Sequence, residues 1–134
     1  MGEAYKLDCD TCTYTENIFV GFGLAYMSLE SVVSFVKDAA LKRCIEEFIG
    51  NPSTRYDAYD ALYVCPDCQA IRNELFIEMK SDSSQYRISY ACPRCTSVMK
   101  QEHIENNENN VLHHLSCPAC EKGKLKATFY MDWD

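Results

Sequence analysis

The sequence predicts a small metal-stabilised α+β fold in which antiparallel zinc-binding hairpins carry one inserted amphipathic helix. Three observations predict this class. A Cys-x-x-Cys motif occurs four times, alternating apolar residues lie between the motifs, and one segment repeats apolar residues at helical spacing. The 134 residues suit one domain, 1–134. We expect sub-lobe 1–70 to hold the first two motifs and the helix, and sub-lobe 71–134 to hold a hairpin meander with the last two.

The Cys-x-x-Cys motifs, called knuckles below, are the strongest chemical signal in the chain. Two cysteines separated by two residues can chelate one ion from a single tight turn, and zinc prefers four thiolates in a tetrahedron. Four knuckles therefore predict two closed sites and two Zn²⁺ ions, although four sulfurs also suit iron. In chain order, the predicted metal ligands are Cys9 and Cys12, Cys65 and Cys68, Cys92 and Cys95, and Cys117 and Cys120.

The same cysteines could instead form disulfides or a redox-active dithiol. No apolar signal segment lies near the N-terminus, and no apolar run approaches the roughly 18 residues of a spanning helix. We therefore expect a cytoplasmic protein that does not associate with membranes, in a compartment where thiols stay reduced and repeated knuckles indicate metal binding. A thioredoxin-like site typically uses one motif at the start of a helix, so the fourfold repeat disfavours redox catalysis.

The charge balance bears on the partners of the protein. The formal net charge is -7, and eight thiolates that bind two divalent ions make it more negative still. Nucleic-acid affinity comes largely from Lys and Arg side chains that neutralise phosphates. The composition therefore disfavours, without excluding, a nucleic-acid partner.

The first half of the chain is predicted to contain two strands and the helix. Residues 5–8 and 13–20 lie on either side of the first knuckle and carry residue types suited to a pleated surface. Ser28 can cap a helix that begins at Leu29 and follows apolar residues at steps of three or four. Gly50, followed by a proline, ends this helix.

The second half alternates strands with the remaining knuckles. Residues 74–80 and 86–91 predict a hairpin that leads to the third knuckle. A second hairpin, of residues 98–104 and 111–115, leads to the fourth knuckle, and a last strand covers 124–131. Because each hairpin goes out and returns, the second, third and fourth knuckles should lie at one end of the sheet.

The last three knuckles share the pattern Cys-Pro-x-Cys, in which the proline presets one turn dihedral. In this feature the chain resembles the zinc-ribbon superfamily. The order of knuckle, Gly-x-Gly, helix, three Cys-Pro-x-Cys knuckles and the tail Met131-Asp132-Trp133-Asp134 resembles small bacterial multi-knuckle zinc proteins, which are uncharacterised. The resemblance implies a ribbon fold with structural zinc. Ribbon knuckles favour glycine after the second cysteine, so Thr13, Gln69, Thr96 and Glu121 predict an unfavourable dihedral or a different turn.

Two pairings of the knuckles satisfy the spacing. Sequential pairing joins the first knuckle to the second across 52 residues and the third to the fourth across 21. Nested pairing joins the second to the third across 23 residues and leaves the outermost knuckles to close the chain ends. Loop-closure cost grows too slowly with length to decide. Sequential pairing is the first choice, and nested pairing stays open.

Several other residues have an ordinary and a functional interpretation. Cys44 lies on the apolar stripe of the helix, where a buried core thiol is more typical than a reactive one. The three histidines suit solvated strand positions better than an additional metal site; they are His103, His113 and His114. Gly21-Phe22-Gly23 lacks the rest of a phosphate loop and indicates a tight turn.

Three lysines form the one basic cluster that could meet nucleic acid. Lys122, Lys124 and Lys126 alternate with small or apolar residues, so they should project from one face of the last strand. A solvated lysine face on an edge strand is the preferred explanation, since such a face also discourages aggregation.

A closed four-sulfur site has no open position for a substrate or water, so these motifs predict a protein that is not an enzyme. We expect a non-catalytic zinc-binding protein that acts as a protein–protein interaction or adaptor module, with no small-molecule substrate. The alternative is a nucleic-acid-associated ribbon in transcription or regulation. A third hypothesis is a redox or metal-responsive sensor whose labile knuckle is Cys9 and Cys12, which lacks proline.

Overall fold

The computed structural model describes residues 2–23, 26–102 and 111–133, and for 111–114 it describes the backbone only. One curved antiparallel sheet dominates, in the strand order β5-β4-β3-β2-β1-β8-β7, with β6 added beside β3. The strands are β1 (Gly2–Cys9), β2 (Thr15–Gly21), β3 (Arg55–Val64), β4 (Ile71–Lys80), β5 (Gln85–Arg87), β6 (Lys100–Glu102), β7 (Val111–Ser116) and β8 (Lys124–Trp133). This antiparallel α+β architecture agrees with the predicted class.

The sheet consists of two halves joined by a narrow seam. Strands β2 and β3 pair only at Gly21 and Asp60, and Gly21 has a φ of 106°, which favours glycine. Beside this pair, the side-chain amide of Asn73 forms hydrogen bonds with the backbone that a neighbouring strand would otherwise form. It accepts from the backbone N–H of Phe19 at 2.8 Å and donates to the carbonyl oxygens of Phe19 at 2.8 Å and Ala61 at 3.0 Å. The Asn73 side chain therefore supplies hydrogen bonds to β2 and β3 where the two strands do not pair with each other.

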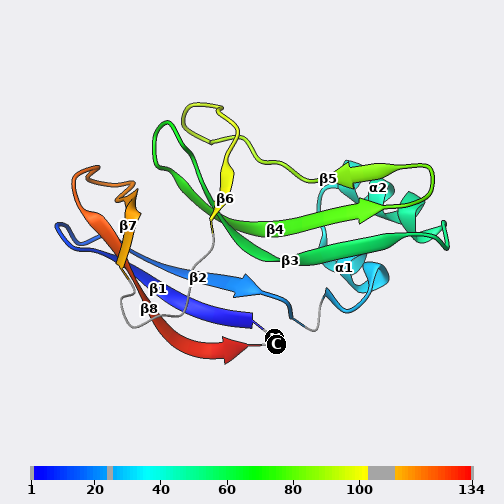
Figure 1. Ribbon diagram of the computed structural model, residues 1–134, viewed down its shortest axis with the longest axis horizontal. Coiled ribbons are helices and arrows are strands. Elements are labelled where there is room, and N and C mark those ends of the chain that lie inside the picture. Colours follow the sequence, from blue (N-terminus) through cyan, green and yellow to red (C-terminus); the bar gives the residue numbers. More distant parts are fainter. Residues whose placement is uncertain (1, 24–25, 103–110, 134) are drawn as a thin grey trace.

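Strands β1 and β8 bring the described chain ends side by side (Figure 1). Gly2 pairs with Trp133, and a Cβ atom at position 2 would collide with the indole ring. The indole Nε1–H donates to the carbonyl oxygen of Glu3 at 3.0 Å. Both strands extend beyond the predicted 5–8 and 124–131 because this contact anchors their ends.

The predicted single helix is wrong, because the described residues between Leu29 and Gly50 form two helices. Helix α1 (Leu29–Phe35) begins where expected, since the Ser28 side chain accepts from the backbone N–H of Ser31 at 3.1 Å. Helix α2 (Ala39–Ile49) follows after a break and ends at Gly50. Its N-cap is Asp38, whose carboxylate accepts from the backbone N–H of Leu41 at 2.8 Å. Such a cap favours a new helix start over a continued helix.

The hairpin predictions are correct in part. Strands β4 and β5 form the first expected hairpin, although β5 covers only Gln85–Arg87. The second expected hairpin, 98–104 with 111–115, does not match the pairing in the described residues: β6 pairs with β3 and β7 pairs with β8. Since β2 meets β3 only at Asp60, the edge of β3 from Leu62 to Val64 is available to β6.

The division into sub-lobes 1–70 and 71–134 stays a prediction. In the sheet, that boundary falls in the turn between β3 and β4, which pair along their whole length from Arg55 with Lys80 to Val64 with Ile71.

Buried side chains form three clusters, and β3 contributes to all of them because its residues alternate between faces. Leu62 and Val64 pack between the two halves of the sheet with Tyr5, Leu7 and Leu125. Two further groups lie under the helices and around the second and third knuckles; they include Ala58, Ile77 and Ile45 in the first group and Tyr63, Met99 and Phe76 in the second. The knuckles and the helices thus occupy opposite ends of the sheet (Figure 1).

Candidate metal centres

The four knuckles gather at one end of the sheet, in the turns between β1 and β2, β3 and β4, and β7 and β8 and in the segment before β6 (Figure 1). They form two groups of four cysteines, and in each group the four sulfur atoms lie within 4.8 Å of one another. The terminal site is Cys9, Cys12, Cys117 and Cys120, and the central site is Cys65, Cys68, Cys92 and Cys95. The preferred sequential pairing is therefore wrong, and the nested pairing is the one observed.

Strand pairing explains the nested arrangement. The register of β1 with β8 places Cys9 opposite Leu125, so the first knuckle lies beside the fourth. The pairing of β6 with β3, together with the bridge between Ala91 and Val98, places the third knuckle beside the second. Neither strand register can be predicted from the number of residues between the knuckles.

The sulfur atoms are spaced as a tetrahedral ion requires. Metal–sulfur bonds of about 2.3 Å give sulfur–sulfur edges of about 3.8 Å in a regular tetrahedron. In the terminal site, Cys9 and Cys120 are 3.7 Å apart and Cys12 and Cys117 are 3.6 Å apart. In the central site, the spacings are 3.4 Å for Cys65 and Cys95, 3.2 Å for Cys68 and Cys92, and 3.7 Å for Cys68 and Cys95. Each of the two sets of four sulfur atoms fits one metal ion of its own.

The three Cys-Pro-x-Cys knuckles share one turn. The residue after the second cysteine lies in the left-handed region, with φ of 66° at Gln69, 64° at Thr96 and 61° at Glu121. Its backbone N–H donates to the carbonyl oxygen of the first cysteine at 3.1, 3.0 and 2.9 Å, respectively. The unfavourable dihedral expected for a non-glycine residue is thus present three times, despite its cost.

The first knuckle has a different turn. Among the described residues, Thr13 is not one of the non-glycine residues with positive φ. The Cys9 N–H donates to the carbonyl oxygen of Tyr14 at 3.1 Å, and Thr11 and Cys12 donate their N–H groups to the Cys9 sulfur, each at 3.3 Å. Both N–H groups therefore contact a sulfur atom that belongs to one of the two four-cysteine groups.

In each site an aspartate inside a knuckle links that knuckle to its partner. Asp10 accepts from the backbone N–H of Lys124 at 2.9 Å, next to the fourth knuckle. Asp67, inside the second knuckle, accepts from the Ser97 hydroxyl, which follows the third. These contacts hold each pair of turns together independently of the metal. These contacts were not predicted from the sequence, although a carboxylate inside a knuckle is a visible signal.

Arg94 connects the two sites. This residue belongs to the third knuckle, and its guanidinium Nη1 donates to the carbonyl oxygen of Pro118 in the fourth knuckle at 2.8 Å. A cation between two four-thiolate groups also offsets part of their negative charge. This bridge was not predicted from the sequence.

The cysteines of the two sites differ in how far they are buried. Cys65, Cys92 and Cys117 are buried, whereas Cys95 is the one exposed cysteine. In the terminal site, N–H groups of Gly123 and then Lys122 lower the pKa of Cys120 to about 6. A thiol with a lowered pKa gives up its proton to a metal ion more readily.

The predicted lysine cluster is exposed, but acidic groups lie among its members. Lys124 and Lys126 are exposed on β8, and Lys122 lies in the preceding turn. The expected edge strand is wrong, because β8 lies between β1 and β7 and pairs with both. The Lys124 ammonium donates to the Ser116 hydroxyl at 3.2 Å. Asp10 contacts the Lys124 backbone, and Asp8 pairs across the strand with Lys126. This face is therefore mixed in charge.

The remaining candidates lie away from the sulfur groups or outside the described residues. Cys44 is half-buried on α2, where burial, followed by the charge of Glu47, raises the pKa of its thiol. His103 lies outside the described residues. His113 and His114 belong to β7, and their side chains are likewise outside the description.

No helix among the described residues is long and apolar enough to cross a membrane. Comparison with protein-family models, curated proteins and solved structures gives no match to this chain. The proposed function is therefore based on the terminal and central sites, each of which has a complete set of four sulfur donors.

Proposed function

We propose that the chain is a non-catalytic protein–protein interaction module whose fold depends on two structural Zn²⁺ ions. The observation that carries this proposal is the closed four-sulfur composition of both sites. Four cysteine ligands saturate a tetrahedral zinc ion, which then has no position for water or substrate. Zinc would supply rigid cross-links between turns at this end of the sheet.

The surface supports a protein partner better than a nucleic acid. Large apolar side chains are exposed at several places: Phe19, Phe22, Met27, Phe35, Val98, Phe129, Tyr130 and Met131. Aromatic residues and methionine are enriched at protein interfaces. The net charge of -7 and the acidic neighbours of the β8 lysines oppose phosphate binding.

Affinity purification of the zinc-loaded chain after mild cross-linking tests the proposal. We expect a protein that cross-links in constant stoichiometry and whose recovery falls when a chelator removes the metal. Recovery of nucleic acid alone would contradict the proposal and favour the ribbon alternative. In that case, replacement of Lys122, Lys124 and Lys126 by glutamine should abolish salt-dependent binding.

The sensor alternative makes a different prediction. The sequence favoured Cys9 and Cys12 as its labile knuckle, but both are partly buried whereas Cys95 is exposed, which favours the central site instead. An exposed metal-bound thiolate is the most accessible target for an oxidant. Mild peroxide should then release one zinc ion and oxidise the central site first. Retention of both ions under these conditions would exclude the sensor function and leave the structural function in place.

A further inference from the structure

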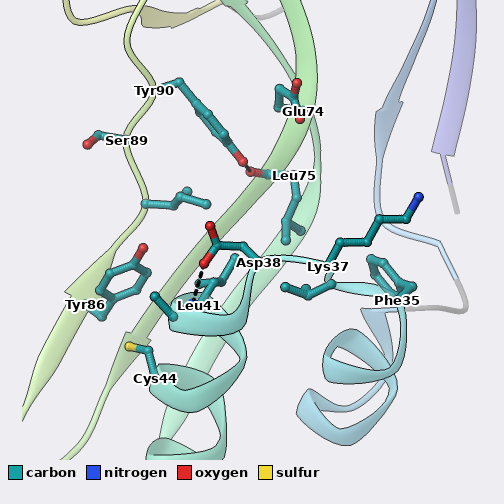
Figure 2. A pocket seen from close by; sticks show the side chains of 13 residues that line it. Phe35, Lys37, Asp38, Leu41, Cys44, Glu74, Leu75, Tyr86, Ser89 and Tyr90 are labelled. Carbon is teal, nitrogen blue, oxygen red and sulfur yellow. Dashed lines mark hydrogen bonds between the residues drawn. The ribbon is translucent and has the colours of Figure 1, made fainter.

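A groove opens at the helical end of the sheet, remote from the two sulfur sites (Figure 2). It lies between the start of α2 and strands β4 and β5, and its volume is about 570 Å³. That volume is within the range of sites that enclose a ligand of a few side chains. Leu41, Leu75 and Ile88 line it, and Cys44 lies at one end.

Two carboxylates and one ammonium group line this groove: they belong to Asp38, Glu74 and Lys37, and Glu74 is paired with Arg72. Figure 2 shows the Asp38 carboxylate over the middle of the groove, while the Lys37 side chain extends away from it. Asp38 accepts a hydrogen bond from the backbone of Leu41, and none of the described residues forms an ion pair with it. The aromatic ring of Tyr86 lies close enough for the Asp38 charge to raise the pKa of Tyr86, after the larger effect of burial and that of Cys44. A carboxylate beside an aromatic ring is a favourable environment for a cation.

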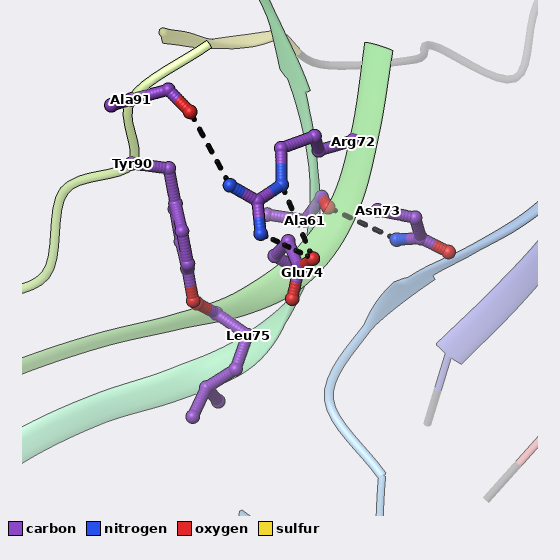
Figure 3. Close-up of polar contacts among 7 residues, drawn as sticks. All are labelled: Ala61, Arg72, Asn73, Glu74, Leu75, Tyr90 and Ala91. Atoms are coloured by element: carbon purple, nitrogen blue, oxygen red, sulfur yellow. Dashed lines mark hydrogen bonds and ion pairs between the residues drawn. The ribbon is translucent and has the colours of Figure 1, made fainter. Parts of the chain in front are cut away.

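The opposite wall is preformed by a second set of contacts. The Tyr90 hydroxyl donates to the carbonyl oxygen of Leu75 at 2.6 Å, and Arg72 lies 5.1 Å from the ring centroid of Tyr90 (Figure 3). Arg72 also pairs with Glu74 at 3.0 Å and donates to the carbonyl oxygen of Ala91 at 3.3 Å. These contacts hold Tyr90 in place, so little side-chain entropy is lost when the wall is covered.

We propose that this groove binds a segment of a partner protein that carries one Lys or Arg side chain between apolar residues. The cation lies between Asp38 and Tyr86, and the apolar neighbours cover Leu41, Leu75 and Ile88. The net charge of -7 attracts such a segment from a distance. This assignment rests on the proposed interaction function and names the chemistry of the partner.

Selection of randomised displayed peptides on the zinc-loaded full chain tests the assignment. Enriched peptides should share a Lys or Arg flanked by apolar residues. Their affinity is then measured by fluorescence polarisation for the wild type and two variants. Asp38→Asn removes the charge but keeps the N-cap, since asparagine caps a helix as well as aspartate does. Glu46→Gln, at an exposed position of α2 outside the groove, is the matched control for the same change in net charge.

We expect Asp38→Asn to weaken binding by about tenfold, the effect of losing one charge-assisted hydrogen bond, and Glu46→Gln to change it less than twofold. A bound peptide should also slow alkylation of Cys44 by a maleimide, as located by peptide mapping, because this thiol lines the groove. Absence of enriched peptides, enrichment of acidic ones, equal effects of the two variants, or unchanged Cys44 alkylation would each overturn the assignment. Peptides that bind elsewhere would overturn the groove alone and leave the interaction function in place.

Discussion

The terminal and central sites have the same four-sulfur chemistry but hold different parts of the chain. The terminal site joins turns at the two ends of the sequence and encloses the 104 residues between Cys12 and Cys117. The central site encloses only the 23 residues between Cys68 and Cys92. By loop-closure entropy, the terminal cross-link stabilises the fold by about 1 kcal/mol more. The two sites have the same ligands, but their positions in the chain give them different contributions to stability.

Removal of both metal ions should have the largest effect on the stability of the folded chain. Structural zinc in small domains contributes on the order of 10 kcal/mol, which is comparable with the whole stability of a domain. A strong chelator should therefore unfold the chain, as measured by circular dichroism, and added zinc should refold it. A spectrum that does not change while the metal content falls to zero would contradict this prediction.

Removal of one site at a time sharpens the comparison. Cys12→Ser with Cys120→Ser removes the terminal site, and Cys68→Ser with Cys95→Ser removes the central one. Native mass spectrometry should show one metal ion in each variant. The terminal variant should be the less stable by about 1 kcal/mol in denaturant unfolding, because its lost cross-link closes the longer loop. The opposite order would show that local packing outweighs loop length.

The terminal site can also be disturbed without changing a cysteine. A Cβ atom at Gly123 would collide with the Cys9 sulfur, so Gly123→Ala should displace this ligand and destabilise the fold by about 1–3 kcal/mol. Its control is Gly50→Ala, where the nearest atom to the new Cβ is the Glu47 carbonyl oxygen at 3.5 Å. Thermal unfolding and zinc-release rates report both effects. Equal zinc release from the two variants would refute the steric argument.

A smaller effect is expected at the bridge between the sites. Arg94→Ala removes the hydrogen bond to the Pro118 carbonyl and should lower the free energy of unfolding by about 1 kcal/mol. It should also make the loss of one metal ion less dependent on the loss of the other, as measured by stepwise chelation. Arg43→Ala, at an exposed position of α2, serves as a control for the loss of one positive charge. Identical chelation curves for Arg94→Ala and the wild type would contradict the coupling.

The smallest expected effect is a gain. Glycine tolerates the left-handed dihedral, so Gln69→Gly and Glu121→Gly should each stabilise the folded chain by up to about 1 kcal/mol in the central and terminal sites, respectively. Thr13→Gly is the matched control, and it should destabilise slightly because the residue lacks that dihedral and glycine is more flexible when unfolded. Equal changes at all three positions in thermal melts would contradict this interpretation.

Features of this fold were predictable from the sequence where they depend on residues that are close together in the chain. Ser28 caps α1, Gly50 ends α2, and the knuckles form chelating turns. The break at Asp38 was missed because apolar spacing continues through it, although a capping residue in the middle of a periodic segment is a visible signal.

Long-range features were not predictable in the same way. The choice of nested pairing depends on the registers of β1 with β8 and of β3 with β6, which no local pattern encodes. The Arg94 bridge and the groove beside Asp38 depend on contacts between segments that are distant in the chain. Which residues bind metal was therefore a simpler question than which residues share one ion.

The contact between Trp133 and Gly2 provides an optical reporter for this topology. Trp133 is the single tryptophan of the chain, and it lies at one end of the β1–β8 strand pair that has the terminal site at its other end. Its fluorescence therefore reports whether this strand pair stays closed. A red shift of its emission on loss of the terminal metal, with no shift on loss of the central one, would show the two cross-links acting independently in real time.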